Sequence, residues 1–429
     1  MQNTKTPPAL MDDCFLHDKD RMRHNEALAL LKERLQSIAT IKTCALNKAN
    51  GHILAADIKA TRHVPPTDNS AVDGYAFNHA EYEKQNTMHI AGRIAAGDIK
   101  NEPLKPNTCV RIFTGAPMPQ GADTVVMQED SVLSKDKDHE SVSIPQGLKQ
   151  GANRRKKGED VKKEDIIATK GTRITPQILA AIASTGMHEI SIYAPLKIAL
   201  ISSGNELLRP SSEIKNPPIE KNYDTNHFML NAMLDALKVE VIDYGILNDN
   251  FETIKDALLK AANECDVILT TGGASKGEED HMIPVLQEIG KRHLWQLAVK
   301  PGRPMSFGQI NKTPYFGLPG NPVASFVCFS LYVRQALLIL AGANTGEPSR
   351  YYVPAGFDFE IKKPDRREFW RGSIVKNEDG ILVLEKYKRD GSGLISALRE
   401  STGLIEVSEE TTSVKKGDLL PFIPFVEFN

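Results

Sequence analysis

Acidic side chains follow three short apolar runs in the middle of this chain. The three segments are SSGNEL (202–207), LNDN (247–250) and TTGGASKGEED (270–280). Their carboxylates include those of Glu206, Asp249 and Asp280. Carboxylate oxygens are the ligands that Mg²⁺ prefers, and substrate phosphates often complete its coordination. The pattern therefore predicts Mg²⁺-assisted chemistry on a phosphorylated ligand, with these three carboxylates as metal ligands.

Glycines and cations in the same region favour an anionic ligand. Gly272 and Gly273 let the backbone turn its N–H groups towards an anion, and we count Ser275 of the same segment among the substrate-binding residues. Further along, VKPGRP places Lys300 and Arg303 three residues apart around a tight turn. Both cations can neutralise the oxygens of a phosphate or another oxyanion.

Each of these features also has a purely structural explanation. A glycine-rich turn often only connects a strand to a helix, Asp249 is well placed to cap a helix, and Lys300 with Arg303 can lie in solvent. Further towards the N-terminus, Asp73-Gly74 reads as a hairpin turn, and the basic run 153–165 as a solvated loop or an anion-docking patch. The ligand site is favoured because several such segments converge on one predicted sheet.

The apolar pattern predicts a doubly wound α/β domain over about 195–343. Strand-length apolar runs lie at 196–202, 239–245, 266–271, 305–310 and 314–320. Helices are expected at about 225–238, 251–262, 280–289 and 322–341. Strands that are apolar throughout are typical of a parallel sheet covered on both faces. Ligands bind beyond the carboxyl ends of such strands, where the acidic and glycine-rich segments fall.

Short β-rich runs flank this domain on both sides. The N-terminal β runs lie between an amphipathic helix over 19–39 and a helix after Thr175. The C-terminal set consists of five runs after position 348, spaced by about ten residues. We therefore expect an α/β and β multidomain protein. Its parts are an N-terminal helical region (11–190) with an inserted β module (about 55–160), the α/β domain (195–343) and a small C-terminal β-barrel (349–429).

Composition excludes some classes of protein. The 429 residues carry 53 Lys and Arg against 55 Asp and Glu, a net charge of −2, whereas general nucleic-acid or membrane-surface binders need a basic excess. The five cysteines are dispersed without a CxxC pair, which indicates a reducing compartment, and no signal peptide is visible, so we expect a cytoplasmic protein. Polar Arg334 and Gln335 interrupt the most apolar run, 322–341, which favours a core helix over a membrane span.

Several segments of the chain occur in the order seen in one known family. They are DNSAVDGYA (68–76), TGAPMPQGADTVVMQE (114–129), RRKKGED (154–160), SSGNEL, YDTN (223–226), TTGGASKGEED, KPGRP (300–304) and GLPGNPV (317–323). This series resembles the MoeA family of molybdopterin molybdenumtransferases, whose eukaryotic relative is the E domain of gephyrin. The resemblance runs from about residue 20 to the end. It is looser after 330, where FWRG (369–372) and DGSG (390–393) carry it.

The resemblance implies a homodimer of elongated, four-domain subunits. The active cleft lies between the central domain of one subunit and the N-terminal β module of the other. Family members insert molybdenum from molybdate into the dithiolene of adenylylated molybdopterin, with Mg²⁺ as cofactor and AMP as product. Contact with the molybdopterin adenylyltransferase is also implied, whereas no nucleic acid or membrane partner is expected.

The resemblance assigns roles to matching positions. Asp73 and Thr114 match polar residues that the β module brings to the partner's cleft. Glu206, Asp249 and Asp280 match carboxylates that serve Mg²⁺ and the attacking water or oxyanion. The positions that bind molybdate and phosphate oxygens are Lys300, Arg303, Arg371 and Ser392. The remaining matches are Pro319 and Pro322, which shape the GLPGNP loop, and Arg155 and Asp160 in a further polar cluster.

Three positions depart from the family pattern. Asn205 replaces a usual acid, Ala324 a frequent serine and Gln296 a lysine found in many members. The loss of a desolvated cation weakens anion binding by about 1 kcal/mol or more, and Arg303 is positioned in sequence to compensate. These departures leave open the level of activity and the preference for molybdate over tungstate.

Two other functions stay open from the sequence alone. A non-catalytic scaffold is one, by analogy with the receptor-anchoring role of gephyrin, but a scaffold does not need Asp73, Glu206, Asp249, Asp280 and Lys300. Adenylyltransferase activity is the other, because that family shares the α/β domain. The long β regions on both sides of the domain disfavour it.

Overall fold

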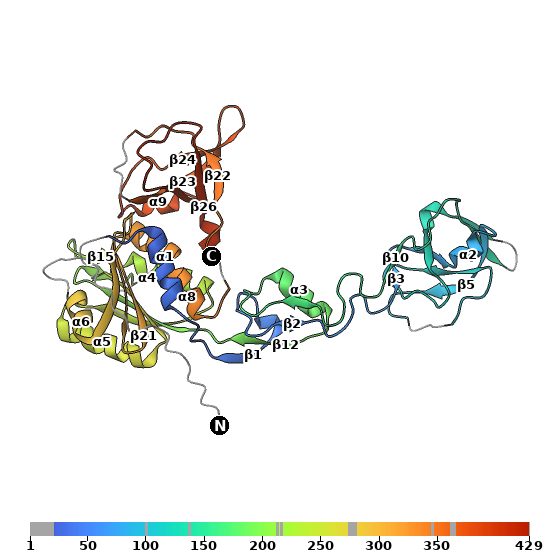
Figure 1. Cartoon of the computed structure of the whole chain (residues 1–429), viewed down its shortest axis with the longest axis horizontal. Coiled ribbons are helices and arrows are strands. Elements are labelled where there is room, and N and C mark those ends of the chain that lie inside the picture. Colours follow the sequence, from blue (N-terminus) through green and yellow to red (C-terminus); the bar gives the residue numbers. More distant parts are fainter. Residues whose placement is uncertain are drawn as a thin grey trace, which may run out of the picture.

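The computed structural model describes residues 21–98, 102–135, 139–211, 214, 218–272, 281–344, 347–360 and 366–428. The molecule is elongated (Figure 1). A central α/β body carries a C-terminal β lobe packed against it. A narrow middle unit, here called the connector, extends from the body and ends in a separate β module, the far lobe.

The central body is built on a six-stranded sheet with the order β16–β13–β17–β21–β20–β18. Its strands are β13 (Lys197–Ser203), β16 (Glu240–Leu247), β17 (Val267–Thr271), β18 (Gly290–Gln296), β20 (Pro304–Ile310) and β21 (Thr313–Leu318). The first four strands in this order are parallel, whereas β20 and β18 extend the sheet antiparallel. The α/β prediction is confirmed, and β18, which has no clear apolar pattern, is an additional strand.

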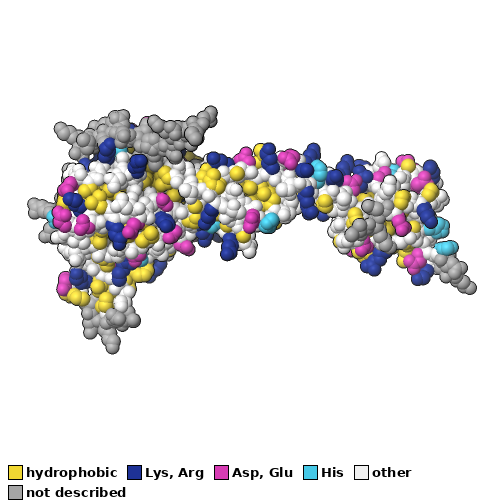
Figure 2. Space-filling view, turned by 90° about the horizontal axis from the view of Figure 1, so that it is seen from below, with side chains coloured by type: hydrophobic (Ala, Val, Ile, Leu, Met, Phe, Trp, Pro, Cys, Tyr) yellow, Lys and Arg dark blue, Asp and Glu magenta, His cyan; other side chains and the backbone are white. Residues whose placement is uncertain are grey.

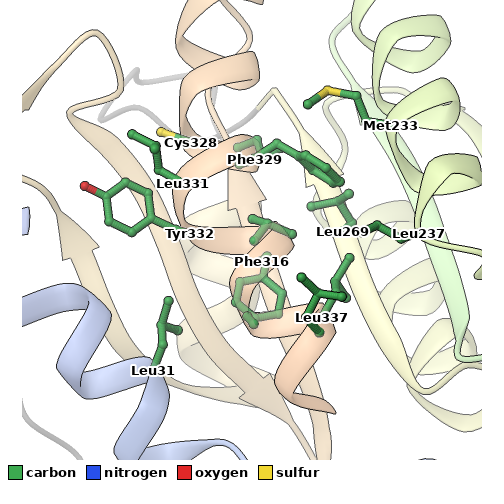
Figure 3. Packing of buried hydrophobic residues seen from close by; sticks show 14 of the residues in the cluster. Leu31, Met233, Leu237, Leu269, Phe316, Cys328, Phe329, Leu331, Tyr332 and Leu337 are labelled. Atoms are coloured by element: carbon green, nitrogen blue, oxygen red, sulfur yellow. The ribbon is translucent and has the colours of Figure 1, made fainter. Parts of the chain in front are cut away.

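Helices cover both faces of this sheet, and its strands are therefore buried on both sides. In β13, Ile198 and Leu200 belong to one core cluster, and Ala199 and Ile201 to another, since alternate side chains point to opposite faces of a strand. The covering elements are α1 (His24–Arg34), α4 (Thr225–Ala236), α5 (Phe251–Glu264), α6 (Met282–Ile289), α7 (Pro322–Cys328), the π-helical η3 (Phe329–Val333) and α8 (Arg334–Leu340). The first core holds α1, α4 and η3–α8, as Figure 3 shows, and the second holds α5 and α6.

The long apolar helix lies inside the body. Elements α7, η3 and α8 form one stretch, Pro322–Leu340, which is the single helix in the described ranges long and apolar enough to cross a membrane. In its most apolar window, 83% of the residues are buried within the protein. The predicted core helix is therefore confirmed.

The connector and the far lobe have cores of their own. The connector contains β1 (Ile41–Ala45), η1 (Leu46–Lys48), β2 (Ile58–Lys59), β11 (Ile166–Ala168), α3 (Pro176–Ser184) and β12 (Glu189–Tyr193). The far lobe contains β3 (Asn69–Ser70), β4 (Gly74–Phe77), α2 (His79–Tyr82), β5 (Thr87–Ile94), β6 (Thr108–Ile112), β7 (Thr124–Met127), η2 (Gln128–Asp130), β8 (Val132–Lys135), β9 (Glu140–Ser143) and β10 (Arg154–Arg155). Six of these strands form one sheet, and Figure 2 shows the two units as an arm on which Lys and Arg side chains are interspersed with acidic and hydrophobic ones.

The C-terminal lobe closes into the predicted small barrel. Its elements are β19 (Val299–Lys300), β22 (Tyr351–Pro354), β23 (Arg367–Lys376), β24 (Leu382–Lys386), α9 (Ile395–Arg399), β25 (Gly403–Val407), β26 (Leu419–Pro424) and η4 (Phe425–Phe428). The sheet order is β19–β23–β25–β26–β22, and β24 pairs with β23. A bridge between Ala355, directly after β22, and Leu384 of β24 joins these two strands and closes the sheet.

Candidate functional site

The loops at the carboxyl edge of the central sheet meet around one cavity of about 850 Å³. The sequence-predicted residues that line it are Glu206, Asp249, Gly272, Pro319 and Pro322. They follow β13, β16, β17 and β21, the four parallel strands. Side chains from distant parts of the sequence converge here because parallel strands end at the same edge of a sheet.

Two hydrogen bonds fix the carboxylate of Asp249 in this cavity. Its Oδ1 accepts from the Ser203 hydroxyl at 2.9 Å, and its Oδ2 accepts from the Asn205 backbone N–H at 3.1 Å. In return, the Asp249 N–H donates to the Asn205 side-chain oxygen at 3.1 Å. Asn205, a departure from the family pattern, therefore joins the loops after β13 and β16 as a neutral group.

Gly272 allows the ends of two strands to approach closely. Its φ is +88°, and a Cβ on this residue would lie 2.1 Å from the backbone oxygen of Ser203. Any side chain would force β13 and β17 apart. The glycine predicted to expose its backbone to a ligand therefore also sets the width of the cavity.

Two further residues of this cavity were missed as site residues by the sequence analysis. Asp224 caps α4 by accepting from the His227 N–H, and its buried carboxylate forms an ion pair with Arg209 at 3.2 Å. Asn226 donates from Nδ2 to the Thr271 hydroxyl and to the Gly320 carbonyl, both at 2.8 Å. Both lie in the YDTN segment, which belongs to the motif series of the resemblance but was assigned no site residues.

A second, smaller pocket of about 240 Å³ adjoins the cavity and is rich in cations. It lies between the central body and the C-terminal lobe, and the two spaces share a wall of Pro304, Pro319 and Asn321. The cationic side chains that line it are Arg21, Lys300, Arg303, Arg366 and Arg371. Three of these were predicted, and the predicted Ser392 lines the same pocket.

Arg371 is the most deeply buried cation of this pocket, with 5% of its surface exposed. Its Nη1 and Nη2 donate at 3.4 Å to the carbonyls of Phe369 and Gly391, and its Nε has no hydrogen-bond partner within the described ranges. Burial lowers the pKa of this guanidinium from its ordinary value, although nearby acids oppose the shift. A buried cation held mainly by carbonyls is suited to bind an anion.

The turn that carries Lys300 and Arg303 packs closely on α7. Gly302 has a φ of +115°, and a Cβ there would lie 2.6 Å from the Cys328 sulfur. At the end of β18, the Gln296 side-chain oxygen accepts from Arg303 Nη2 at 3.4 Å. Gln296, where many family members carry lysine, thus contacts the arginine expected to compensate for it. Ala324, the third departure, lines the pocket wall.

The predicted pair Asp73 and Thr114 lies in the far lobe, away from both pockets. The Asp73 Oδ1 accepts from the Thr114 N–H and from the Thr114 hydroxyl, both at 2.8 Å. These two bonds lower the pKa of the Asp73 carboxyl below its ordinary value. Arg155 of β10 and the nearby Asp160, whose N–H donates to the Val64 carbonyl, also lie at this end of the arm.

Part of the predicted site falls outside the described residues, namely Gly273, Ser275 and Asp280. Within the ranges that the structure describes, no group of three or more His, Cys, Asp or Glu side chains is arranged to hold a metal ion. Two of the three predicted Mg²⁺ ligands, Glu206 and Asp249, do line one cavity.

Comparison with known families defines the class of protein. Three family models match in consecutive order. They are the MoeA N-terminal region (domain I and II) at residues 22–186, a probable molybdopterin binding domain at 199–338, and the MoeA C-terminal region (domain IV) at 352–425. The chain thus consists of an α/β domain that matches a probable molybdopterin binding domain, set between two MoeA regions.

Individual relatives extend over nearly the whole chain. A molybdopterin molybdenumtransferase of Haemophilus influenzae is 34% identical over 402 residues, which cover 94% of this chain and 98% of the relative. One of Bacillus subtilis is 28% identical over 379 residues, 87% of each. The crystal structure of a molybdopterin biosynthesis MoeA protein from Pyrococcus horikoshii matches with a TM-score of 0.78 at 28% identity, covering 94% of this chain and all of that one. The chain belongs to the MoeA family.

Proposed function

We propose that this protein transfers molybdenum from molybdate to adenylylated molybdopterin and releases AMP, as a molybdopterin molybdenumtransferase of molybdenum cofactor biosynthesis. The observation that carries the proposal is the pair of adjoining pockets. One holds three carboxylates and glycine-rich strand ends, the other holds five cations and the single acid Asp390, and they share a wall. A nucleotide and a separate oxyanion can therefore bind side by side.

The small pocket is the proposed molybdate site. Molybdate is a tetrahedral dianion, and Lys300, Arg303 and Arg371 supply positive charge with many N–H donors. Ser392 adds a hydroxyl to the same pocket. The buried Arg371 contributes most, because charge-assisted hydrogen bonds are strongest where water is excluded.

The large cavity is the proposed site of the adenylylated substrate. Backbone groups at Gly272 and the loop containing Pro319 and Pro322 can contact its phosphates. Water attack on one phosphorus breaks its bond to the bridging oxygen. The products are AMP and the terminal phosphate of molybdopterin, and the protons of the water pass to solvent. Asp249, whose orientation Ser203 and Asn205 fix, is the proposed residue that orients that water.

The donor set of this cavity fits Mg²⁺. This ion commonly takes one or two carboxylates and completes its shell with water and substrate phosphates. Glu206 and Asp249 would hold it, with Asp280 as the third expected ligand. When bound, Mg²⁺ supplies charge neutralisation at the phosphate oxygens and polarises the phosphoanhydride.

The proposed assembly is a homodimer in which the far lobe of one subunit completes the cleft of the other. The support is that Asp73 and Thr114 form a pre-arranged exposed pair that contributes to neither pocket of its own chain. A second copy is the natural partner, because most soluble oligomers are symmetric and use one interface twice.

Mixed subunits test this arrangement. Chains with Asp73→Asn and chains with Arg371→Gln are each expected to be inactive. In a heterodimer of the two, one cleft receives an intact lobe and an intact pocket, so about half of the wild-type activity returns. No recovery in the purified heterodimer would contradict a cleft shared between subunits.

The function itself is tested with adenylylated molybdopterin, molybdate and Mg²⁺. We expect release of AMP and formation of active cofactor, and Asp280→Ala is expected to stop AMP release in a folded protein. Omitting molybdate controls for simple hydrolysis. If no AMP is released, the proposal is wrong, and consumption of ATP with unadenylylated molybdopterin would identify an adenylyltransferase instead.

A further inference from the structure

A buried carboxylate lies directly behind the cationic pocket. Glu368 is the second residue of β23, where it is the register partner of Lys300 in the parallel pair β19–β23. Only 2% of its surface is exposed. It was not singled out from the sequence.

Three donors contact this one carboxylate. Its Oε1 accepts from Arg366 Nε at 3.1 Å, and its Oε2 accepts from the Trp370 indole N–H at 2.7 Å. Lys300 Nζ forms an ion pair with Oε2 at 3.7 Å. Since the indole binds one oxygen and the guanidinium the other, the carboxylate is fixed in rotation as well as in position.

A carboxylate in this place opposes anion binding by charge alone. A buried negative charge repels an oxyanion, and its own desolvation is costly unless it is paired. Any favourable effect of Glu368 on anion binding must therefore come through Lys300 and Arg366, the two pocket cations that it contacts. Lys300 has a long flexible side chain that is 42% exposed, and in solvent such a group samples many positions.

We propose that Glu368 is a positioning residue of the oxyanion pocket, which holds the Lys300 ammonium and the Arg366 guanidinium at the wall facing the bound anion. The inference rests on the proposed function, in which this pocket takes molybdate. An ammonium has three N–H donors and a guanidinium five. Glu368 accepts from the Nε–H of Arg366 and pairs with one side of the Lys300 ammonium. The other donors remain for the oxyanion.

The positioning role and simple electrostatics predict opposite effects of Glu368→Gln on the affinity for molybdate. The substitution keeps the shape and an oxygen acceptor for Trp370 but removes the charge that holds the cations. If Glu368 acts only as a nearby negative charge, its neutralisation tightens anion binding. If it positions Lys300 and Arg366, we expect molybdate to bind roughly tenfold more weakly, because charge-assisted contacts are lost. Isothermal titration of the full chain with molybdate alone measures the change.

Three further variants complete the experiment. Glu385→Gln removes an exposed acid from the neighbouring strand β24 and controls for net charge. Its affinity for molybdate should equal that of the wild type. Glu368→Asp keeps the charge on a shorter side chain and should restore part of the affinity. In a Lys300→Met background, Glu368→Gln should cost clearly less than in the wild type, because the two residues act through one contact.

The outcomes separate the two proposals. Unchanged or tighter molybdate binding by a folded Glu368→Gln variant, with a wild type that binds, overturns the positioning role alone. If Glu368→Gln does not fold, the decision falls to Glu368→Asp, which should bind molybdate more weakly than the wild type and should cost less in a Lys300→Met background. Wild-type affinity in a folded Glu368→Asp variant then overturns the positioning role. A wild type that binds no molybdate overturns the proposed function, and this inference with it.

Discussion

The C-terminal lobe and the far lobe are both small β units on one body, but they are joined to it in different ways. In the C-terminal lobe, Phe369, Leu404 and Ile423 belong to the same core cluster as the central sheet. In addition, β19, which lies between two strands of the central sheet along the chain, is itself a strand of the lobe's sheet. The far lobe has clusters of its own around Phe77 and Ile112. A lobe with a shared core can complete a pocket within one chain, whereas a lobe on an arm can serve another copy.

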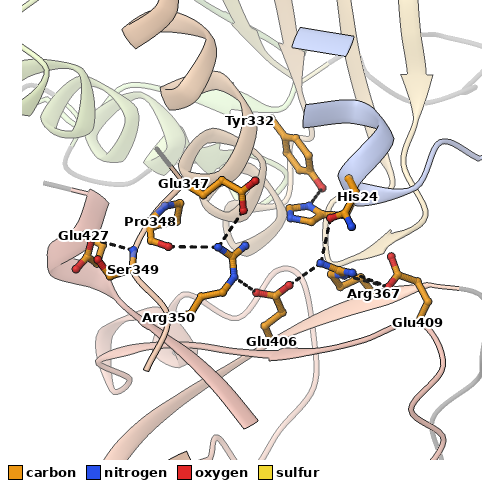
Figure 4. A network of polar contacts seen from close by, with 11 residues as sticks. His24, Tyr332, Glu347, Pro348, Ser349, Arg350, Arg367, Glu406, Glu409 and Glu427 are labelled. Atoms are coloured by element: carbon orange, nitrogen blue, oxygen red, sulfur yellow. Dashed lines mark hydrogen bonds and ion pairs between the residues drawn. The ribbon is translucent and has the colours of Figure 1, made fainter. Parts of the chain in front are cut away.

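A buried polar network strengthens the first junction (Figure 4). Arg367 of the C-terminal lobe pairs with Glu406 at 2.7 Å and with Glu409 at 2.9 Å, and it also contacts Asn25 of α1. His24 on the same helix shares a hydrogen bond of 2.7 Å with the Tyr332 hydroxyl. The network connects the N-terminal helix, the core helix and the barrel, which together hold the cationic pocket in shape.

The largest effect is expected for Arg367→Ala, which breaks this junction. Burial alone would lower the pKa of Arg367, but Glu409 and Glu406 raise it, in line with a strongly paired cation. Removing it takes away the ion-pair partner of the buried Glu409 and leaves the buried Glu406 paired with Arg350 alone, so we expect a loss of about 3–5 kcal/mol in the free energy of unfolding. Urea denaturation measures it, with the exposed Arg389→Ala as the control. A loss as small as that of the control would mean that the network does not stabilise the junction.

The next largest effect is a dependence of the free energy of unfolding on pH, which arises from His24. Burial, and then the charges of Arg367 and Arg350, lower its pKa from 6.5 to about 3. The unfolded chain therefore binds a proton that the folded protein excludes, and stability falls as the pH drops below about 6.5. At pH 5 this group should cost about 2 kcal/mol relative to pH 8.

The measurement for His24 compares urea denaturation at pH 8 and pH 5 in the wild type and in His24→Asn. The asparagine keeps an acceptor for the Tyr332 hydroxyl but cannot take up a proton in this range. The variant should therefore lose about 2 kcal/mol less than the wild type between the two pH values. An identical pH dependence in both proteins would exclude His24 as the titrating group.

The parallel strands and the convergence of the loops that follow them were predictable from the sequence, because the apolar pattern was local. Apolar runs such as 266–271 identified parallel strands, and the acids after them were therefore expected at one edge. Glu368 was not predictable, because its role arises from pairing with Lys300, 68 positions away, across a parallel strand pair. Strand β18 was also missed, because its apolar pattern is weak and it forms a strand through its pairing with β20. The proposed role of Asp73 involves a second copy of the chain, which no local pattern describes.

A smaller effect is expected at the pocket itself for Gln296→Lys. The substitution restores the lysine of many relatives and adds a cation beside Arg303, at the cost of a 3.4 Å hydrogen bond. We expect molybdate to bind about fivefold more tightly, which corresponds to about 1 kcal/mol. Titration with molybdate measures it, and Gln296→Met controls for the lost hydrogen bond alone. Weaker binding by the lysine variant would indicate that Gln296 serves mainly to hold Arg303.

The smallest effect is expected at the base of the far lobe for Arg154→Ala. Arg154 on β10 pairs with Asp68 at 3.5 Å, and both side chains are partly exposed, so the pair contributes less than about 1 kcal/mol. Hydrogen exchange should change slightly in the far lobe and remain unchanged in the central sheet, because the two cores share no cluster. Faster exchange in β13 or β17 would show that the arm and the body unfold together. The contrast between a lobe that shares the core of the body and one carried on an arm would then be lost.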